Sequence, residues 1–528
     1  MNFNSLLRET FAYYAPRFDR DEHAKTSFAW NLRLRLPLPS RSASRSEADT
    51  GFMAASLLTT NASAESGPHV ASFITDVVGD VSRPRAALPP TAELGHLPGD
   101  GGPAVGARNV LAWRRRGVAH AVEQCRRFGP VHRSQMGPLP YVGVSDPELL
   151  LSIARNDDCA WSAALPWSTI FRGINAESAT FDAPVTLDFE LHREARRLLQ
   201  SGFSPAAMAA YVAMASEMFA DTLDGWVELG RVEFKPAVRR LLAGVSSRTL
   251  VGCHAALDAE LLDRALADVW GGTFALMNSQ THRRAIRGYE SLRKMLSPLV
   301  ERRRAAPGPD LFSRLCVAGS GPDWLDDATL VRLFIGVMAA AFDTTSCGLS
   351  SMAYLLATHT DWQERLRSEV MSLKHQRFVH EDSKALPLMD RVWKETLRLF
   401  PVAATLPRTA LCDVALGPWH IPAGTFVQGL IGPVLRDPAW WTRPESFDPE
   451  RFSDERAEDR RHRALFMPFG SGAHACIGMQ LASVEVKAFW FTMLSRCRFR
   501  LAPRYAAHHS YAPLGSVSGD VAITIERL

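Results

Sequence analysis

The chain has 528 residues, of which 46% are hydrophobic and 22% charged, the values of an ordinary globular protein. Its formal net charge of +4 argues against a nucleic-acid-binding protein. Its eight cysteines are irregularly spaced without a CxxC pair, which argues against a disulfide framework and indicates a reducing compartment. Because there is neither a long apolar run nor a signal-peptide pattern, we expect a cytoplasmic protein without a membrane span.

The N-terminal region differs in composition from the rest of the chain. Residues 1–95 are polar, small and aperiodic, so we expect a poorly ordered extension there. The stretch 83–106 is rich in proline and glycine and predicts a linker. We assign residues 96–528 to one folded domain.

Helical periodicity dominates that domain, and short apolar segments suggest a few strands. The predicted fold class is mainly α with a small β portion (α+β). Helices are expected at 109–128, from Asp146 onward, and at 188–202, 206–228, 258–281, 284–304, 326–357, 361–373 and 388–399. Strands are expected near 130–134, 140–144, 405–428, 497–502 and 520–526.

The sharpest local signal is the segment 469–478, where three glycines surround Cys476 just before a helix expected from Ile477. Glycine lets the backbone approach a bulky flat ligand, and a thiolate before a helix N-terminus is favoured by the helix dipole. A buried structural cysteine after a glycine-rich turn is the alternative reading.

Three other segments place polar residues at helical spacing. Asp343 and Thr344 interrupt an apolar helix, where a threonine can bond back to a carbonyl and an acid is costly unless paired. Glu395 and Arg398 are three residues apart and can form a salt bridge. Taken singly, Asp343 with Thr344 would indicate a helix kink, and Glu395 with Arg398 would be a surface ion pair. Likewise, His192 with Arg196, four residues apart, would be a solvated basic face.

The segment 469–478 resembles the heme-binding loop of the cytochrome P450 family, FxxGx(H/R)xCxG, and every specified position matches. The resemblance implies that Cys476 is the axial ligand of the iron of heme b. It also implies that Phe469 packs near the sulfur and that His474 reaches a propionate. The matching positions are Phe469, Gly472, His474, Cys476 and Gly478.

The other segments match further motifs of this family, in the family's order. Glu395 and Arg398 resemble the ExxR helix, and Arg451 in the PERF-like segment 447–452 would complete a structural Glu-Arg-Arg cluster. By the same resemblance, Thr344 hydrogen-bonds dioxygen or its water and Asp343 helps to relay protons, although Ala341 stands where the family usually has glycine. The implied propionate-binding residues besides His474 are His192, Arg196 and Arg408.

The resemblance covers about residues 97–528 and implies the P450 fold, with soluble bacterial members as the nearest type. It implies a monooxygenase that inserts one atom of O2 into a lipophilic substrate, with electrons from a ferredoxin and its reductase or a flavodoxin-type donor. A same-fold enzyme that uses peroxide or does not oxygenate, and a non-catalytic heme sensor, remain open. We expect a monomer whose basic residues Arg193 and Arg197 dock the electron donor. Candidates for the substrate pocket are Trp167, Phe171, Val337, Ala340, Ala403, Ala404, Thr405, Leu406, Ser516 and Val517.

Overall fold

The structure is a computed structural model that describes residues 94–170, 183–252, 259–272, 279–318, 325–374, 376–503, 505, 507–511 and 514–528. Of the predicted N-terminal extension, only residues 94 and 95 belong to this part, so the expected lack of order stays a prediction.

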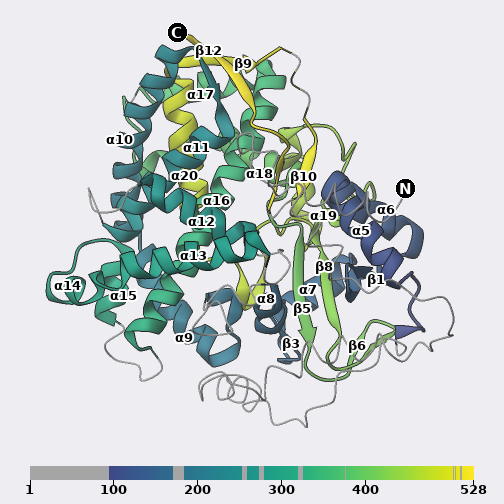
Figure 1. The fold of residues 1–528 in the computed structure, drawn as a ribbon. Coiled ribbons are helices and arrows are strands. Elements are labelled where there is room, and N and C mark those ends of the chain that lie inside the picture. The colour runs from purple at the N-terminus through teal and green to yellow at the C-terminus, as the bar shows by residue number, and fades with distance from the viewer. Residues whose placement is uncertain are drawn as a thin grey trace, which may run out of the picture. The chain divides into compact units, whose positions relative to one another are not determined.

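Most of the described chain is helical, as the periodicity predicts (Figure 1). Several helices begin where a side chain caps the free N–H groups of the first turn, for example at Asp146, Ser204 and Asp326. The longer helices are α5 Pro103–Arg116, α6 Val118–Phe128, α7 Pro147–Arg155, α9 Phe189–Gln200, α10 Pro205–Leu229, α11 Phe234–Ser246, α12 Ala259–Gly272, α13 Gln280–Leu296, α16 Asp327–Thr358, α17 Thr360–Ser372, α18 Pro387–Leu399 and α20 Met479–Leu494. Shorter ones are α8 Ala164–Ile170, α14 Leu299–Ala305, α15 Leu311–Ala318 and α19 Ile431–Val434.

Two of the predicted helices are divided in the structure, and one observed helix was not predicted. The helix expected at 109–128 is two helices, α5 and α6, because Gly117 adopts a positive φ of 48° between them. The helix expected at 284–304 is divided into α13 and α14 next to Pro298, which cannot supply a helical N–H. The sequence prediction missed α11, whose first turn contains Pro236, a residue more easily read as a helix breaker.

The β portion is small and lies beside the helices. Its largest sheet has the order β1-β2-β8-β5-β3, in which only β2 and β8 run parallel. The remaining strands form a three-stranded sheet, β4-β12-β9, and two hairpins, β6-β7 and β10-β11. The strands are β1 Val131–Met136, β2 Leu139–Val144, β3 Trp161–Ser162, β4 Arg231–Glu233, β5 Thr405–Ala410, β6 Val414–Leu416, β7 Trp419–Ile421, β8 Phe426–Leu430, β9 Cys497–Leu501, β10 His509–Tyr511, β11 Gly515–Val517 and β12 Ala522–Arg527.

Helix α16 is the central element of the larger hydrophobic core. Figure 1 shows it among α11, α12, α18 and α20, with the strands β5 and β8 to one side. Its most apolar 18-residue window has a mean hydropathy of 1.4, which by length and composition alone would suit a membrane span. However, 76% of that window is buried inside the described fold, as is expected of a core helix.

Candidate functional site

The cysteine loop is held in a shape that only glycine permits at one position. Gly472 has a positive φ of 69°, and a Cβ added there would lie 2.0 Å from the carbonyl oxygen of Ala154 on α7. The amide of Cys476 donates to the carbonyl of Phe469 at 2.8 Å and closes the loop. Cys476 therefore sits at a defined point just before α20, which begins at Met479, two residues later than predicted.

The thiol of Cys476 is enclosed by protein and yet accessible. Burial raises its pKa, while the N–H groups of Gly478 and Met479 and the charge of Arg196 act in the opposite direction. Its side chain nevertheless has an exposed surface. The Cys476 sulfur is therefore surrounded by protein on most sides and still open to solvent. N–H donors and a nearby cation stabilise a thiolate, the form in which cysteine binds a metal.

Two arginines and two histidines gather around this loop. The guanidinium of Arg196 on α9 donates to the carbonyl of Ala475. The rings of His192 and His474 stack with centroids 3.9 Å apart. Burial lowers the pKa of His192 to about 4 and that of His474 to about 2, with the neighbouring positive charges acting in the same direction. Both rings are therefore neutral near pH 7.

Arg408 on β5 is the member of this group that most clearly indicates an anionic ligand. Its side chain is only 2% exposed, and its Nη2 has no hydrogen-bond partner. Burial lowers its pKa to about 10, and the charge of Asp188 opposes that shift. Asp188 is itself engaged with Ser162 and with the amide of Ala163 at 2.8 Å. A buried, incompletely paired guanidinium is costly and suits an anionic group of a ligand.

These residues fit the heme that the sequence resemblance implies. Cys476 can provide a thiolate to the iron, and Arg196 and Arg408 are cations suited to its two propionates. His192 and His474, which the resemblance implies as propionate-binding residues, stack against each other at the same place. Phe469 packs against the hydrophobic core beside the loop.

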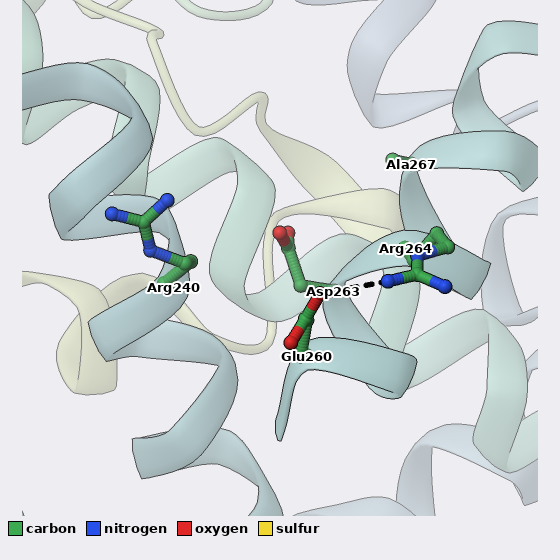
Figure 2. A pocket seen from close by; sticks show the side chains of 5 residues that line it. All are labelled: Arg240, Glu260, Asp263, Arg264 and Ala267. Carbon is green, nitrogen blue, oxygen red and sulfur yellow. Dashed lines mark hydrogen bonds and ion pairs between the residues drawn. The ribbon is translucent and has the colours of Figure 1, made fainter. Parts of the chain in front are cut away.

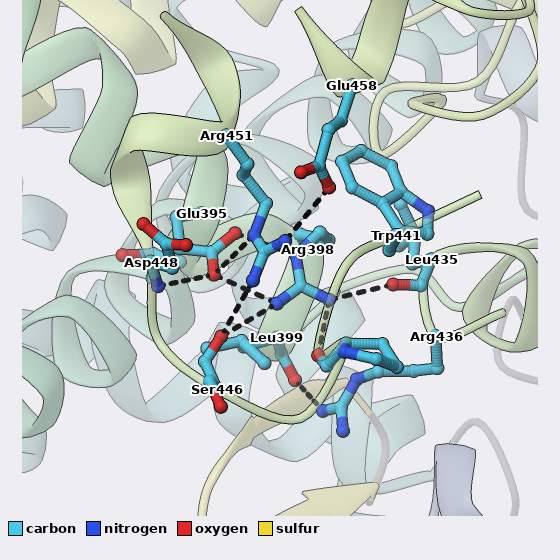
Figure 3. Close-up of polar contacts among 12 residues, drawn as sticks. Glu395, Arg398, Leu399, Leu435, Arg436, Trp441, Ser446, Asp448, Arg451 and Glu458 are labelled. Carbon is cyan, nitrogen blue, oxygen red and sulfur yellow. Dashed lines mark hydrogen bonds and ion pairs between the residues drawn. The ribbon is translucent and has the colours of Figure 1, made fainter. Parts of the chain in front are cut away.

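The Glu-Arg-Arg cluster forms in the structure and is larger than predicted. Glu395, Arg398 and Arg451 are all fully buried (Figure 3). Arg398 donates to both oxygens of Glu395, at 2.7 and 2.9 Å, and Arg451 donates to one of them at 3.1 Å. Glu458 receives a further hydrogen bond from Arg451 at 3.0 Å. The sequence prediction missed Glu458, because nothing in its local pattern distinguishes it from the surface acids around it.

Asp343 and Thr344, the residues predicted to activate oxygen, lie in the middle of α16. The hydroxyl of Thr344 donates to the carbonyl of Ala340 at 2.7 Å. Asp343 is 7% exposed and accepts from Arg239 of α11 at 2.7 and 3.4 Å. Burial raises the pKa of Asp343, and the charge and hydrogen bonds of Arg239 oppose the rise. Asp343 thus pairs with Arg239 of α11, a partnership that the sequence did not reveal.

A charged hollow lies near this ion pair. It lies at the surface between α11 and α12 (Figure 2). Asp263 in its wall is 3.2 Å from Arg239. Glu260 and Arg264 pair across its rim at 2.7 Å. Its lining contains neither Cys476 nor Thr344, so it is a polar surface feature outside the thiolate site.

The candidate pocket residues fall into four groups. Ala340 and Ala403 are exposed, although they belong to otherwise well-buried segments. Ser516 and Val517 are buried against α16, with the Ser516 hydroxyl 3.4 Å from the carbonyl of Cys347. Phe171 lies outside the described residues. The remaining candidates, Trp167, Val337, Ala404, Thr405 and Leu406, are buried or partly buried.

Comparisons with known proteins agree with this geometry. A family model described as "Cytochrome P450" matches residues 98–521. A "Putative cytochrome P450 136" of Mycobacterium tuberculosis is 30% identical over 445 residues, which cover 81% of this chain and 88% of the relative. A "Cyclooctat-9-en-7-ol 5-monooxygenase" of Streptomyces melanosporofaciens is 29% identical over 335 residues, covering 60% and 72%.

The fold itself has a solved counterpart, described as "Retinoic acid bound cyanobacterial CYP120A1". It superposes with a TM-score of 0.74 at 23% sequence identity, covering 82% of this chain and 99% of that one. The family model spans most of the chain and includes the cysteine loop, the ExxR helix and the α16 motif. The chain belongs to the cytochrome P450 family, whose members bind heme through a cysteine thiolate.

Proposed function

We propose that this protein inserts one oxygen atom of O2 into a lipophilic small molecule while the other atom leaves as water. The observation that carries the proposal is the Asp343–Thr344 pair in the turn of α16 that also contains the exposed Ala340. When bound through Cys476, heme supplies the iron and the thiolate electron donation that favour cleavage of the O–O bond.

Thr344 and Asp343 would provide the protons. A threonine hydroxyl has one hydrogen and two acceptor sites, and in Thr344 the hydrogen is engaged with the Ala340 carbonyl. The hydroxyl can therefore accept a hydrogen bond, and it can donate one after rotating. Asp343 is connected through Arg239 to Asp263 at the wall of the charged hollow, so that this ion-pair chain holds the carboxylate of Asp343 in place and extends to the protein surface.

An apolar substrate suits the side chains near this turn. Ala340 and Ala403 offer small apolar surfaces, and Val337 lies one turn before Ala340 on α16. Both compounds named for the similar proteins, cyclooctat-9-en-7-ol and retinoic acid, are largely hydrocarbon. We therefore favour a substrate with a large hydrocarbon skeleton over a polar metabolite.

A separate electron donor would reach the cysteine side through α9. Arg193 and Arg197 are exposed, whereas His192 on the same helix is buried and Arg196 partly buried. This division supports α9 as a helix with one side toward the site and the other toward solvent. An acidic ferredoxin or a flavodoxin-type protein would be steered to such a surface. We propose that this takes place in the cytoplasm, with the enzyme as a monomer.

The test combines a spectrum with a product assay. We expect the ferrous carbonyl complex to show the strongly red-shifted Soret band of thiolate ligation, and Cys476→Ala to abolish it. Cys159→Ala is the matched control, because Cys159 is also exposed and lies outside the loop. Incubation with isotopically labelled O2 and a surrogate ferredoxin system should place the label in the product. Product formation from peroxide alone, or no oxygenated product from any bound compound, would favour the alternative enzyme or the sensor.

A further inference from the structure

Helix α12 contacts α16 at the turn that precedes Thr344. The indole Nε1–H of Trp270, near the end of α12, donates to the carbonyl of Ala339 at 2.9 Å. A second polar connection runs from Asp263 of α12 through Arg239 to Asp343, with distances of 3.2 and 2.7 Å. Two independent contacts therefore hold α12 against residues 339–343 of α16.

Three successive carbonyls of α16 accept a side-chain hydrogen bond at this turn. Ala339 accepts from Trp270, Ala340 from Thr344 at 2.7 Å, and Ala341 from Thr345 at 2.9 Å. Each of these carbonyls is also the acceptor for the amide four residues later in a regular helix. Extra donors of this kind draw carbonyls away from the helix axis and bend helices.

The donor on Ala339 differs from the other two in its origin. The hydroxyls of Thr344 and Thr345 belong to α16 and move with it, so they cannot fix its position. Trp270 belongs to another helix, and its ring is partly buried against the core. Its N–H therefore fixes the Ala339 carbonyl in space. Because Ala339 precedes Ala340 directly, the orientation of the acceptor for Thr344 depends on that contact.

We propose that Trp270 is a positioning residue for oxygen activation, which rests on the proposed role of Thr344. Its N–H holds the turn at Ala339 so that Ala340 receives the Thr344 hydroxyl. Its N–H donates to the Ala339 carbonyl, so it acts on Thr344 through the α16 backbone. Through this contact, the position of α12 affects the orientation of the Thr344 hydroxyl and therefore the delivery of protons.

The experiment compares two tryptophan variants. Trp270→Phe keeps an aromatic ring and removes the N–H donor. Trp393→Phe is the matched control, because Trp393 also packs on α16, where a Cβ at Gly348 would lie 2.5 Å from its ring, but its Nε1 has no hydrogen-bond partner. Both variants should bind heme with the wild-type carbonyl spectrum.

The first measurement is amide hydrogen exchange, which needs no turnover. In Trp270→Phe, the amides around residues 339–345 should exchange about threefold to tenfold faster, as expected for the loss of one hydrogen bond. In Trp393→Phe, exchange in that peptide should equal that of the wild type. Equal protection of the peptide in Trp270→Phe and the wild type would overturn the proposal.

The second measurement is the peroxide released per NADPH consumed, with a surrogate ferredoxin system and a compound found by its spectral shift. Trp270→Phe should raise this ratio, and in the Thr344→Ala background it should raise it no further. An additive effect in the double variant would refute the positioning role. If Thr344→Ala itself leaves the ratio unchanged, the proposed function of Thr344 fails, and the exchange measurement still decides the contact of Trp270.

Discussion

Replacing Glu395 by glutamine keeps the shape of the side chain but removes the negative charge between two buried arginines. Glu395 Oε1 accepts from Arg398, from Arg451 and from the amide of Asp448 at 2.9 Å, and Oε2 accepts from Arg398 Nε at 2.7 Å. A glutamine oxygen can keep one of these positions only. Its NH2 group then meets an arginine N–H, so that two donors face each other in a site without solvent.

The size of the effect follows from these contacts. Each hydrogen bond to a charged group contributes about 1.5–3 kcal/mol, and at least one becomes a repulsive contact. Within the described part of the chain, Arg398 loses the one carboxylate with which it pairs, whereas Arg451 keeps Glu458. Removing one member of a buried pair costs about 3–5 kcal/mol. We therefore expect Glu395→Gln to lower the free energy of unfolding by about 3–5 kcal/mol and to reduce heme retention.

The assay is denaturant unfolding of the holoenzyme, followed in parallel by far-ultraviolet circular dichroism and by the Soret band. Glu450→Gln is the matched control in the neighbouring segment. Glu450 pairs with Arg365 and with Arg391 at 2.8 Å, but its side chain is 35% exposed, so we expect a loss of at most about 1 kcal/mol. If both variants were equally stable, the reasoning from burial would be refuted.

Four further predictions concern other parts of the chain. Gly472→Ala should prevent heme incorporation, because its Cβ would lie 2.0 Å from a backbone oxygen. Gly225→Ala is the control and should incorporate heme normally, because its Cβ would have nothing within 4 Å. Comparable heme content in the two variants would contradict the prediction. Burial alone would raise the pKa of Glu458, but its arginine partners and a backbone N–H lower it. The stability that Glu458 contributes is therefore present above its unfolded pKa and is lost as pH falls through the folded pKa. Unfolding curves of Glu458→Gln and the wild type should therefore converge in acid, and a constant difference would count against it. Arg193→Glu with Arg197→Glu should slow the first electron transfer from an acidic ferredoxin and flatten its salt dependence; a wild-type salt slope would remove α9 from the docking surface. A chain beginning at residue 94 should fold and bind heme, and failure to do so would show that the preceding residues are needed.

The sequence predicted those parts of the site that are local in the chain. The cysteine loop could be recognised because its function requires glycines at fixed distances from Cys476. Arg239 could not be found in the same way, because its pairing with Asp343 joins two helices 104 residues apart and α11 itself was missed. Trp270 has no local signal either, since a tryptophan in an amphipathic helix is ordinarily a core residue. Contacts between helices depend on packing, which periodicity does not specify.

The domain contains two groups of buried charge that are balanced in different ways, and the difference bears on their roles. The two arginines that contact Glu395, Arg398 and Arg451, are met by carboxylates and backbone carbonyls, for example Arg398 by the carbonyl of Leu435 at 2.9 Å. Around Cys476, Arg408 keeps an unpaired buried nitrogen, and Asp188 is engaged by other donors. A satisfied cluster needs nothing further and serves stability. An unsatisfied cluster is costly until an anion binds, so we expect the free energy that destabilises the protein without its ligand to favour binding of the heme propionates.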